Sequence, residues 1–383
     1  MDDNSLSQLT YPLDSEIKPM MTRRQLATRA LQTLAGVSLV NASSLLALGR
    51  AFVVPSIAAL PETGTLQRIT FGSCARQTRG QPIWRTIGAR SPDMFLFLGD
   101  NVYADTNSPR IMRSRYADLA AIPEFAEFRS QIPIMATWDD HDYGRNDAGA
   151  EYEMRATSQQ IFLDFFGVSP TSPRRERAGI YHAETFGEPG KRVQIIMLDT
   201  RYHRSGLVRG ANDYRPSYDP EATFLGEEQW QWLEAVLKQP AELRIVGSSI
   251  QFASSQHRFE KWSNLPLERS RLLDTIKRTK ANGVVIVSGD RHMAEISQIP
   301  KASEGAPYQI FDMTCSGMNQ RNSGSRNEAN RFRLPGSRTH TISHFGQIDV
   351  DWDVGDVMLS IVSIDGVVLE SARVPLSSLI VDQ

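Results

Sequence analysis

Residues that can bind metal ions follow several short apolar segments of the sequence. In chain order they are Cys74, Asp100, Tyr103, Asp139, Asp140, His141, Asp290 and His292. Carboxylates gathered in one place repel one another unless a cation neutralises them. Because thiol, phenol and imidazole groups accompany the carboxylates, the pattern indicates a metal centre with more than one ion. Two ions roughly 3.5–4 Å apart commonly bind a phosphoryl group and activate water for in-line attack.

The apolar segments predict the strands that carry these residues. Each is four to six residues long and rich in Ile, Val, Leu and Phe, which is typical of strands covered on both faces. The predicted strands are Gln67–Phe71, Met94–Leu98, Ile132–Thr137, Val193–Leu198, Leu243–Val246 and Val284–Val287. In open α/β sheets, ligands bind beyond the carboxyl ends of the strands, so we expect these residues to converge on one rim.

Helical segments separate the strands, which indicates an α/β core. The helices are predicted at Pro109–Ala120, Glu227–Lys238 and Leu267–Thr279. Towards the C-terminus, alternating apolar and polar residues predict antiparallel strands at Gly346–Trp352, Val357–Ser363 and Val367–Val374. Asp365-Gly366 suits the turn of a C-terminal β-hairpin within residues 346–375.

The first 60 residues are predicted to be a leader, and residues 61–383 the folded domain. Thr22-Arg23-Arg24-Gln25-Leu26 precedes an apolar stretch, residues 30–54, whose only charge is Arg50. Small residues follow near Ser56-Ile57-Ala58, which completes the pattern of an export signal of the twin-arginine kind. An uncleaved membrane anchor, a surface amphipathic helix and cytoplasmic residence are the alternatives. No later segment has eighteen unbroken apolar residues, so no stable membrane span is expected in the mature protein.

The composition excludes several other classes of protein. The 383 residues include 42 basic and 44 acidic side chains, a formal net charge of −2, whereas nucleic-acid-binding proteins usually carry a basic excess. The two cysteines, Cys74 and Cys315, exclude a disulfide framework, and Cys315 is expected to pack in the interior. The histidines outside the motifs are expected on the surface or in loops: His182, His203, His257, His340 and His344.

Five motifs together resemble the PhoD-type alkaline phosphatases and phosphodiesterases, within the calcineurin-like metallophosphoesterases. They are Cys74 after a strand, Gly99-Asp100-x-x-Tyr103, Trp138-Asp139-Asp140-His141-Asp142, Leu198-Asp199-x-Arg201 and Ser288-Gly289-Asp290-x-His292. The resemblance runs from about Ile69 to the last hairpin. It implies a metallophosphoesterase-like αββα sandwich over residues 61–383, with Fe3+ and Ca2+ as cofactors and a phosphate ester as substrate.

The resemblance also implies roles for single residues. Asp100 would bridge the ions, with Cys74 and Tyr103 binding iron and Asp290 nearby. Asp140 matches the position of a second-ion ligand, and Asp139 and Asn146 are the candidates for calcium. His141 would donate a proton to the leaving oxygen, His292 would bind metal or form a hydrogen bond, and Arg201 would hold a phosphate oxygen.

Each of these residues has a structural alternative. Cys74 and Tyr103 could be buried packing residues, and Asp140 and His141 could cap a helix. Asp199 could either orient Arg201 or seal a loop.

Two departures from the family pattern stand out. The cysteine strand begins within ten residues of the predicted signal, where many relatives carry a separate β-domain, so a short form is expected. The usual histidine after Val246 is replaced by Ser248, Ser249 and Gln251, which leaves that ligand position open.

The predicted function is metal-dependent hydrolysis of phosphomonoesters in an exported protein, located in the periplasm, outside the cell or at its surface. Phosphodiesterase action, including release of phospholipid head groups as in a phospholipase D, is the alternative within the class. A secreted protein that binds metal only for stability is the alternative from another class. The expected partners are the substrate and the twin-arginine translocation machinery, with no nucleic acid except as a possible substrate.

Overall fold

The computed structural model describes residues 57–61, 64–320 and 328–382, which belong to one compact unit, residues 54–383. The predicted twin-arginine motif and its apolar stretch lie outside the described residues. Among the helices that are described, none is long and apolar enough to cross a membrane.

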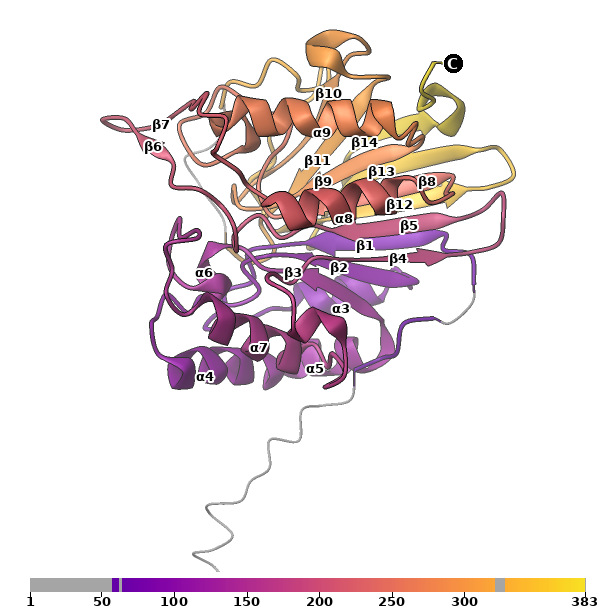
Figure 1. Cartoon of the computed structure of the whole chain (residues 1–383). Helices are drawn as coiled ribbons and strands as arrows, with labels where there is room; N and C mark the ends of the chain where they lie inside the picture. The colour runs from indigo at the N-terminus through magenta and orange to yellow at the C-terminus, as the bar shows by residue number, and fades with distance from the viewer. Residues whose placement is uncertain (1–56, 62–63, 321–327, 383) are drawn as a thin grey trace, which may run out of the picture. The chain divides into compact units, whose positions relative to one another are not determined.

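Two six-stranded sheets form the centre of the unit (Figure 1). The first has the order β14-β13-β12-β1-β2-β3, and the second has the order β10-β11-β9-β8-β5-β4. The first sheet contains β1 (Arg68–Gly72), β2 (Met94–Leu98), β3 (Ile134–Thr137), β12 (His344–Asp351), β13 (Asp356–Ser363) and β14 (Val368–Pro375). The second contains β4 (His182–Phe186), β5 (Val193–Met197), β8 (Leu243–Ser248), β9 (Val284–Ser288), β10 (Ala294–Ile299) and β11 (Ile310–Cys315).

The middle of each sheet is parallel, as the runs of buried apolar residues predict. Strands β1, β2 and β3 pair in parallel, and so do β5, β8, β9 and β11. Successive side chains of β2 enter different cores: Met94, Leu96 and Leu98 pack in one cluster, while Phe95 and Phe97 pack in the other. The first cluster joins the two sheets, and the second joins the first sheet to its helices.

Helices cover the outer faces of both sheets (Figure 1). The core between the first sheet and its helices contains residues of α3 (Ile83–Gly88), α4 (Pro109–Ala120), α5 (Pro123–Gln131) and α7 (Arg155–Phe165). The other core contains residues of α8 (Glu227–Leu237) and α9 (Pro266–Arg278). Two sheets between two helical layers confirm the predicted αββα sandwich.

The C-terminal hairpin is present and is part of the first sheet. Strands β13 and β14 pair antiparallel, β12 pairs with β13, and β12 also pairs antiparallel with β1. The strand that precedes Cys74 therefore lies between β2 and a strand from the end of the chain. This arrangement adds three antiparallel strands to the parallel part of the sheet.

Several elements lie where no regular structure was predicted. Strands β4, β10 and β11 extend the second sheet at its two edges, and the loop of residues 206–220 contains a small hairpin of β6 (Val208–Arg209) and β7 (Tyr214–Arg215). The remaining short elements are α6 (Asp140–Tyr143) and the 3-10 turns Pro173–Arg175, Trp262–Asn264, Ser303–Gly305 and Leu376–Ser378. The expectation that the other histidines lie on the surface or in loops is wrong for His344, which is buried in β12. His257 and His340 are also buried, but they lie outside the named helices and strands.

Gly99 allows the ends of β2 and β3 to approach closely. Its φ is +98°, and a Cβ atom there would lie 2.5 Å from the Cβ of Asp139 and 2.7 Å from the backbone nitrogen of Asp139. Both the conformation and the space therefore exclude a side chain at this position. Asp100, which follows Gly99, and Asp140, which follows Asp139, are both candidate metal ligands.

Replacing Gly99 by alanine is expected to lower the free energy of unfolding by about 2–4 kcal/mol, because it adds backbone strain and overpacking together. Urea denaturation in the presence of a chelator measures this effect without a contribution from metal. Gly80→Ala is the matched control, because a Cβ at Gly80 meets nothing within 4 Å. A Gly99→Ala protein as stable as Gly80→Ala would contradict the close approach of the two strand ends.

Candidate metal centre

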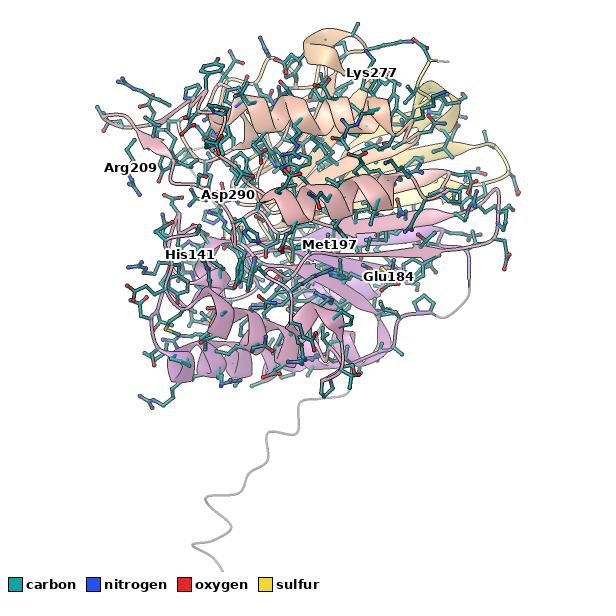
Figure 2. The ribbon with its side chains drawn as sticks, viewed as in Figure 1. His141, Glu184, Met197, Arg209, Lys277 and Asp290 are labelled. Atoms are coloured by element: carbon teal, nitrogen blue, oxygen red, sulfur yellow. The ribbon has the colours of Figure 1, made fainter. Side chains whose placement is uncertain are left out.

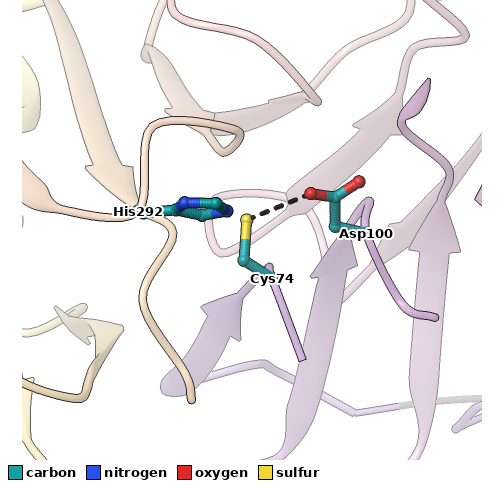
Figure 3. Close-up of side chains that lie close together, drawn as sticks. All are labelled: Cys74, Asp100 and His292. Atoms are coloured by element: carbon teal, nitrogen blue, oxygen red, sulfur yellow. Dashed lines mark hydrogen bonds between the residues drawn. The ribbon is translucent and has the colours of Figure 1, made fainter. Parts of the chain in front are cut away.

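The loops after β1, β2, β3 and β9 bring the predicted ligands together on one rim. One ligand atom from each of Cys74, Asp100 and His292 lies within 4.8 Å of the others (Figure 3). Asp100, Asp140 and His141 form a second group that meets the same criterion. Asp100 belongs to both groups, which is the arrangement that a carboxylate shared by two neighbouring ions requires.

Hydrogen bonds connect the members of the first group. The thiol of Cys74 donates to Oδ2 of Asp100 over 3.4 Å, and Oη of Tyr103 lies 3.1 Å from Nε2 of His292. Burial raises the pKa of Tyr103 well above its ordinary value, and the neighbouring Asp100 and Cys74 raise it further. Tyr103 therefore lies beside all three members of the group.

The electrostatics of the first group fit a bound cation. Burial raises the pKa of Asp100 well above its ordinary value, and the neighbouring carboxylates, Asp140 first, add to this effect. Burial likewise raises the pKa of the Cys74 thiol, and Asp100 raises it further. Oδ1 of Asp100 is buried and has no hydrogen-bond partner among the described residues. A metal ion would occupy this unused oxygen and favour the charged forms of these groups.

His141, in the second group, has a partner that the sequence analysis did not identify. Its Nδ1 lies 2.7 Å from Oδ1 of Asp105, which comes from the loop after β2. Burial alone would lower the pKa of His141, but Asp100, Asp140 and Asp105 raise it to about 11. The imidazole ring also packs against the ring of Tyr103, with 4.4 Å between the centroids. Only the position of Asp105 two residues after Tyr103 could have suggested this pairing.

The second group also fixes the loop that follows α6. Oδ1 of Asp140 accepts a hydrogen bond from the backbone of His141 over 2.8 Å, and Oδ2 accepts one from the backbone of Asp147 over 2.7 Å. Asp140 therefore holds the first turn of α6 and the loop after it, while its carboxylate lies next to Asp100.

The backbone at the rim adopts conformations that side chains rarely favour. Cys74, Asp100, Asp290 and His292 have φ values of 61°, 50°, 69° and 55°. Non-glycine residues in the left-handed region cost free energy and persist only where the surrounding structure holds them. Their concentration at this rim is typical of a functional site.

Asp142 supplies part of that support. Its carboxylate accepts hydrogen bonds from the backbone nitrogens of Asp100, Asn101 and Asp139 over 3.1, 3.3 and 2.7 Å. It also accepts one from Nδ2 of Asn101 over 2.6 Å. One buried carboxylate thus ties the loop that carries Asp100 to the loop that carries Asp139. Asp142 belongs to the motif Trp138-Asp139-Asp140-His141-Asp142, but its spacing there predicted no role for it.

Asp139 and Arg201 form a buried ion network beside the two ligand groups. Nε of Arg201 donates to Oδ1 of Asp139 over 2.6 Å, and Nη1 of Arg201 lies 2.6 Å from Glu260. Glu260 also lies 3.0 Å from Nε of Arg204, and all four side chains are at most 2% exposed. Arg201 is therefore already neutralised inside the protein, and its contact with phosphate stays a prediction.

Four predicted metal ligands lie outside the two groups: Tyr103 and Asp139, which are described above, and Asn146 and Asp290. Asn146 is exposed in the loop after α6. Asp290 is partly buried at the end of β9, and its pKa is raised by burial and by Asp139. In Figure 2, Asp290 and His141 are labelled on the same side of the unit. Their roles as ligands stay predictions.

Asp199 has both of the roles that the sequence left open. Its Oδ1 accepts hydrogen bonds from the backbone of Arg201 and from Nε1 of Trp138, each over 2.9 Å. Its Oδ2 accepts one from the backbone of Ile180, also over 2.9 Å. Asp199 therefore positions the backbone of Arg201 and closes the neighbouring loop.

The open ligand position after β8 is not filled by the side chains found there. Ser248 donates to the backbone carbonyl of Ile250, and Ser249 donates to Oδ1 of Asp139. Gln251 donates to Glu295 and Thr314. Cys315 is buried and forms no disulfide with Cys74, as expected.

The comparisons with known proteins agree with this geometry. Residues 69–358 match the PhoD-like phosphatase family. The chain belongs to this family. Membership of this family confirms the family and the fold that the five motifs predict, while the individual metal ligands stay predictions.

Individual PhoD-like relatives show how far the similarity extends. The chain is 25% identical to alkaline phosphatase D of Bacillus subtilis (strain 168), in a match that covers 63% of this chain and 48% of the relative. The chain thus spans about half the length of this curated relative. A solved structure of PhoD shares the fold, with a TM-score of 0.67 and 18% identity over 84% of this chain and 70% of that one.

Proposed function

We propose that this protein is a metal-dependent phosphoric ester hydrolase that acts on phosphomonoesters, as an alkaline phosphatase D does. The observation that carries the proposal is the position of Asp100, which two groups of metal-ligand side chains share in a chain of the PhoD-like phosphatase family. No covalent nucleophile is needed for this reaction, since water attacks the phosphoryl group directly.

The first group would hold a ferric ion and the second a calcium ion. Cys74, Tyr103 and His292 supply the sulfur, phenol and imidazole ligands that suit iron, and Asp140 supplies carboxylate oxygen, which suits calcium. Asp139, whose Oδ2 has no hydrogen-bond partner in the described part of the chain, and Asn146 are further candidates for calcium, and Asp290 for iron. When bound, such ions polarise the phosphoryl oxygens and lower the pKa of a bound water.

His141 is the proposed proton donor to the leaving oxygen. Asp105 fixes its ring through Nδ1, and Nε2 makes no hydrogen bond to any described residue, so that nitrogen stays available to a substrate. His292, which is held by Tyr103, would bind metal or assist the leaving group from the other side. Arg201, which is held in its ion network, would position the loop that carries Asp139.

Phosphodiesterase action is the second candidate, since the same ions and proton donor serve both reactions. We expect the walls of the substrate pocket to come from the segments Thr106–Arg129 and Gly206–Thr223. Their shape would determine whether a monoester or a diester fits. The second of these segments is tied to the centre, because Oη of Tyr214 donates to Oδ2 of Asp147 over 2.6 Å. Release of a phospholipid head group is one form of the diester reaction.

Export by the twin-arginine route is the proposed fate of the chain. It rests on Arg23-Arg24 before the apolar stretch and on a folded unit that begins near residue 54. The mature protein would then work in the periplasm, outside the cell or at its surface.

Replacing Asp100 by asparagine is expected to reduce hydrolysis by at least about 1,000-fold, which is roughly 4 kcal/mol of transition-state stabilisation. The metal-loaded protein is assayed with p-nitrophenyl phosphate as monoester and bis(p-nitrophenyl) phosphate as diester. Without metal, the variant should be at least as stable as the wild type, because the raised pKa of Asp100 shows that burying its charge is unfavourable.

Asp118→Asn is the matched control, because Asp118 lies on α4 in an exposed ion pair with Arg115. It should keep full activity. A wild-type protein that hydrolyses neither ester, but loses thermal stability on chelation, would favour the non-catalytic metal-binding protein. Faster hydrolysis of the diester than of the monoester would favour the phosphodiesterase.

Protein purified without chelator is expected to contain iron and calcium by elemental analysis. It should also show a visible absorption band from the bond between ferric iron and the Tyr103 phenolate. Tyr103→Phe should lose or strongly shift this band. Tyr116→Phe should keep it, because Tyr116 is equally buried but donates to Asp142, outside both groups. A colourless protein without iron would overturn the ferric assignment and leave the hydrolase proposal intact.

Protein exported by the producing cell is expected to lack residues up to about Ala58, as intact mass measures. Arg23→Lys combined with Arg24→Lys should keep the full-length chain inside the cell. Recovery of the wild-type chain with residues 1–58 intact from the cytoplasm would favour cytoplasmic residence.

A further inference from the structure

The proposed reaction needs a cation for the non-bridging oxygens of the phosphoryl group, and the buried state of Arg201 raises the question of which residue supplies it. Arg201 is 0% exposed, and Asp139 and Glu260 both contact its guanidinium group. Its guanidinium group is therefore closed off from a phosphate in solution. A guanidinium group at the rim without a carboxylate partner would suit this role better.

Arg76 meets that description. It lies two residues after Cys74, and its guanidinium carbon is 4.0 Å from the centre of the Tyr103 ring. Arg76 takes part in none of the ion pairs of the described residues, and its Nε is buried without a hydrogen-bond partner there. The two other arginines of this rim are occupied, since Arg201 pairs with Asp139 and Arg291 pairs with Glu328.

The backbone around Arg76 is held firmly against the metal-site loops. Asn319 accepts from the backbone nitrogen of Arg76 over 2.7 Å and donates to its carbonyl over 2.9 Å. The next residue, Gln77, donates to the carbonyl of Tyr103 over 3.0 Å and accepts from its backbone nitrogen over 2.9 Å. Arg76 and Tyr103 are therefore fixed relative to each other, and no loop closure is needed to bring the guanidinium group beside the ligands.

The charge of Arg76 is incompletely satisfied. Its Nε is buried without a hydrogen-bond partner among the described residues, and a buried donor of this kind lacks an acceptor that it would otherwise have in water. The guanidinium group lies over the ring of Tyr103, whose hydroxyl oxygen is 3.1 Å from Nε2 of His292, so it lies close to the first ligand group.

We propose that Arg76 binds a non-bridging oxygen of the substrate's phosphoryl group and is the arginine of this site that contacts substrate, while Arg201 positions the loop of Asp139. The proposal rests on the proposed phosphoric ester hydrolysis. The planar guanidinium group, stacked on Tyr103, can present two N–H donors to a phosphate whose other oxygens face the metal ligands. Arg76 forms no covalent bond and transfers no proton.

The test is the binding of inorganic phosphate to the metal-loaded full chain, measured by calorimetry, together with kcat/KM for p-nitrophenyl phosphate. Arg76→Ala is expected to weaken phosphate binding and to lower kcat/KM, each by roughly 10- to 100-fold, as loss of a charge-assisted hydrogen-bond pair does. Arg76→Lys should recover part of the binding, because it keeps the charge but not the planar fork. Added guanidinium ion should partly restore the Arg76→Ala enzyme.

Arg79→Ala is the matched control. Arg79 lies three residues further along the same loop, is exposed, and contacts Asn319 and Gln320. It should bind phosphate within about twofold of the wild type, because an exposed polar contact is worth little. Metal content is measured in every variant, so a loss of phosphate binding is interpreted only at unchanged occupancy.

Two results would overturn the proposal. One is an Arg76→Ala protein that binds phosphate as tightly as the wild type, even if its visible absorption band shifts, since Arg76 would then act only on Tyr103. The other is a wild-type protein that binds no phosphate. If the wild type binds phosphate through Arg76 but hydrolyses neither ester, the proposed function fails while the assignment of Arg76 as the anion-binding residue holds.

Discussion

The central physical constraint on this structure is the burial of several carboxylates at the ends of neighbouring strands. Asp100, Asp139, Asp140 and Asp142 are all buried within one rim. The two arginines of the adjacent network balance only Asp139 and Glu260, since each buried charge there has an opposite partner. Asp100 and Asp140 have only His141 as a nearby cation outside that network, and His141 also pairs with Asp105, so bound metal ions would neutralise the remaining negative charge. The arrangement of the surrounding loops follows from that requirement.

Two structural features hold these side chains in place: sharp backbone turns after the strands, and hydrogen bonds from the backbone to Asp142. Positive φ values at Cys74, Asp100 and His292 turn the chain sharply after each strand, so the side chains point to one place. Asp142 then satisfies the backbone nitrogens that these turns leave without partners. A carboxylate that binds no metal in this scheme is therefore as necessary to the geometry as those that do.

The sequence predicted the central strands and most of the rim because both have local signals. Buried parallel strands are continuous apolar runs, and their carboxyl ends meet at one edge whatever the loops do, so Cys74, Asp100 and His292 could be placed together. Strands β10 and β11 contain Glu295, Ser297, Asp312 and Thr314, all buried, and such polar positions hide the apolar pattern. The pairing of His141 with Asp105 and the neutralisation of Arg201 by Glu260 depend on loops from distant parts of the chain. Spacing along the sequence carries no information about such contacts.

The insertion of β12 beside β1 also has a kinetic consequence. Arg68 at the start of β1 pairs with Asp349, a partner 281 residues later in the chain, and both lie in adjacent antiparallel strands. The strand that leads to Cys74 therefore lacks one of its two neighbours until residues 344–351 have been made. Contacts of such long sequence separation form slowly, because the loop must close before any of them is gained. The sheet that carries Cys74 is thus completed late in folding, after residues 344–351 have been made.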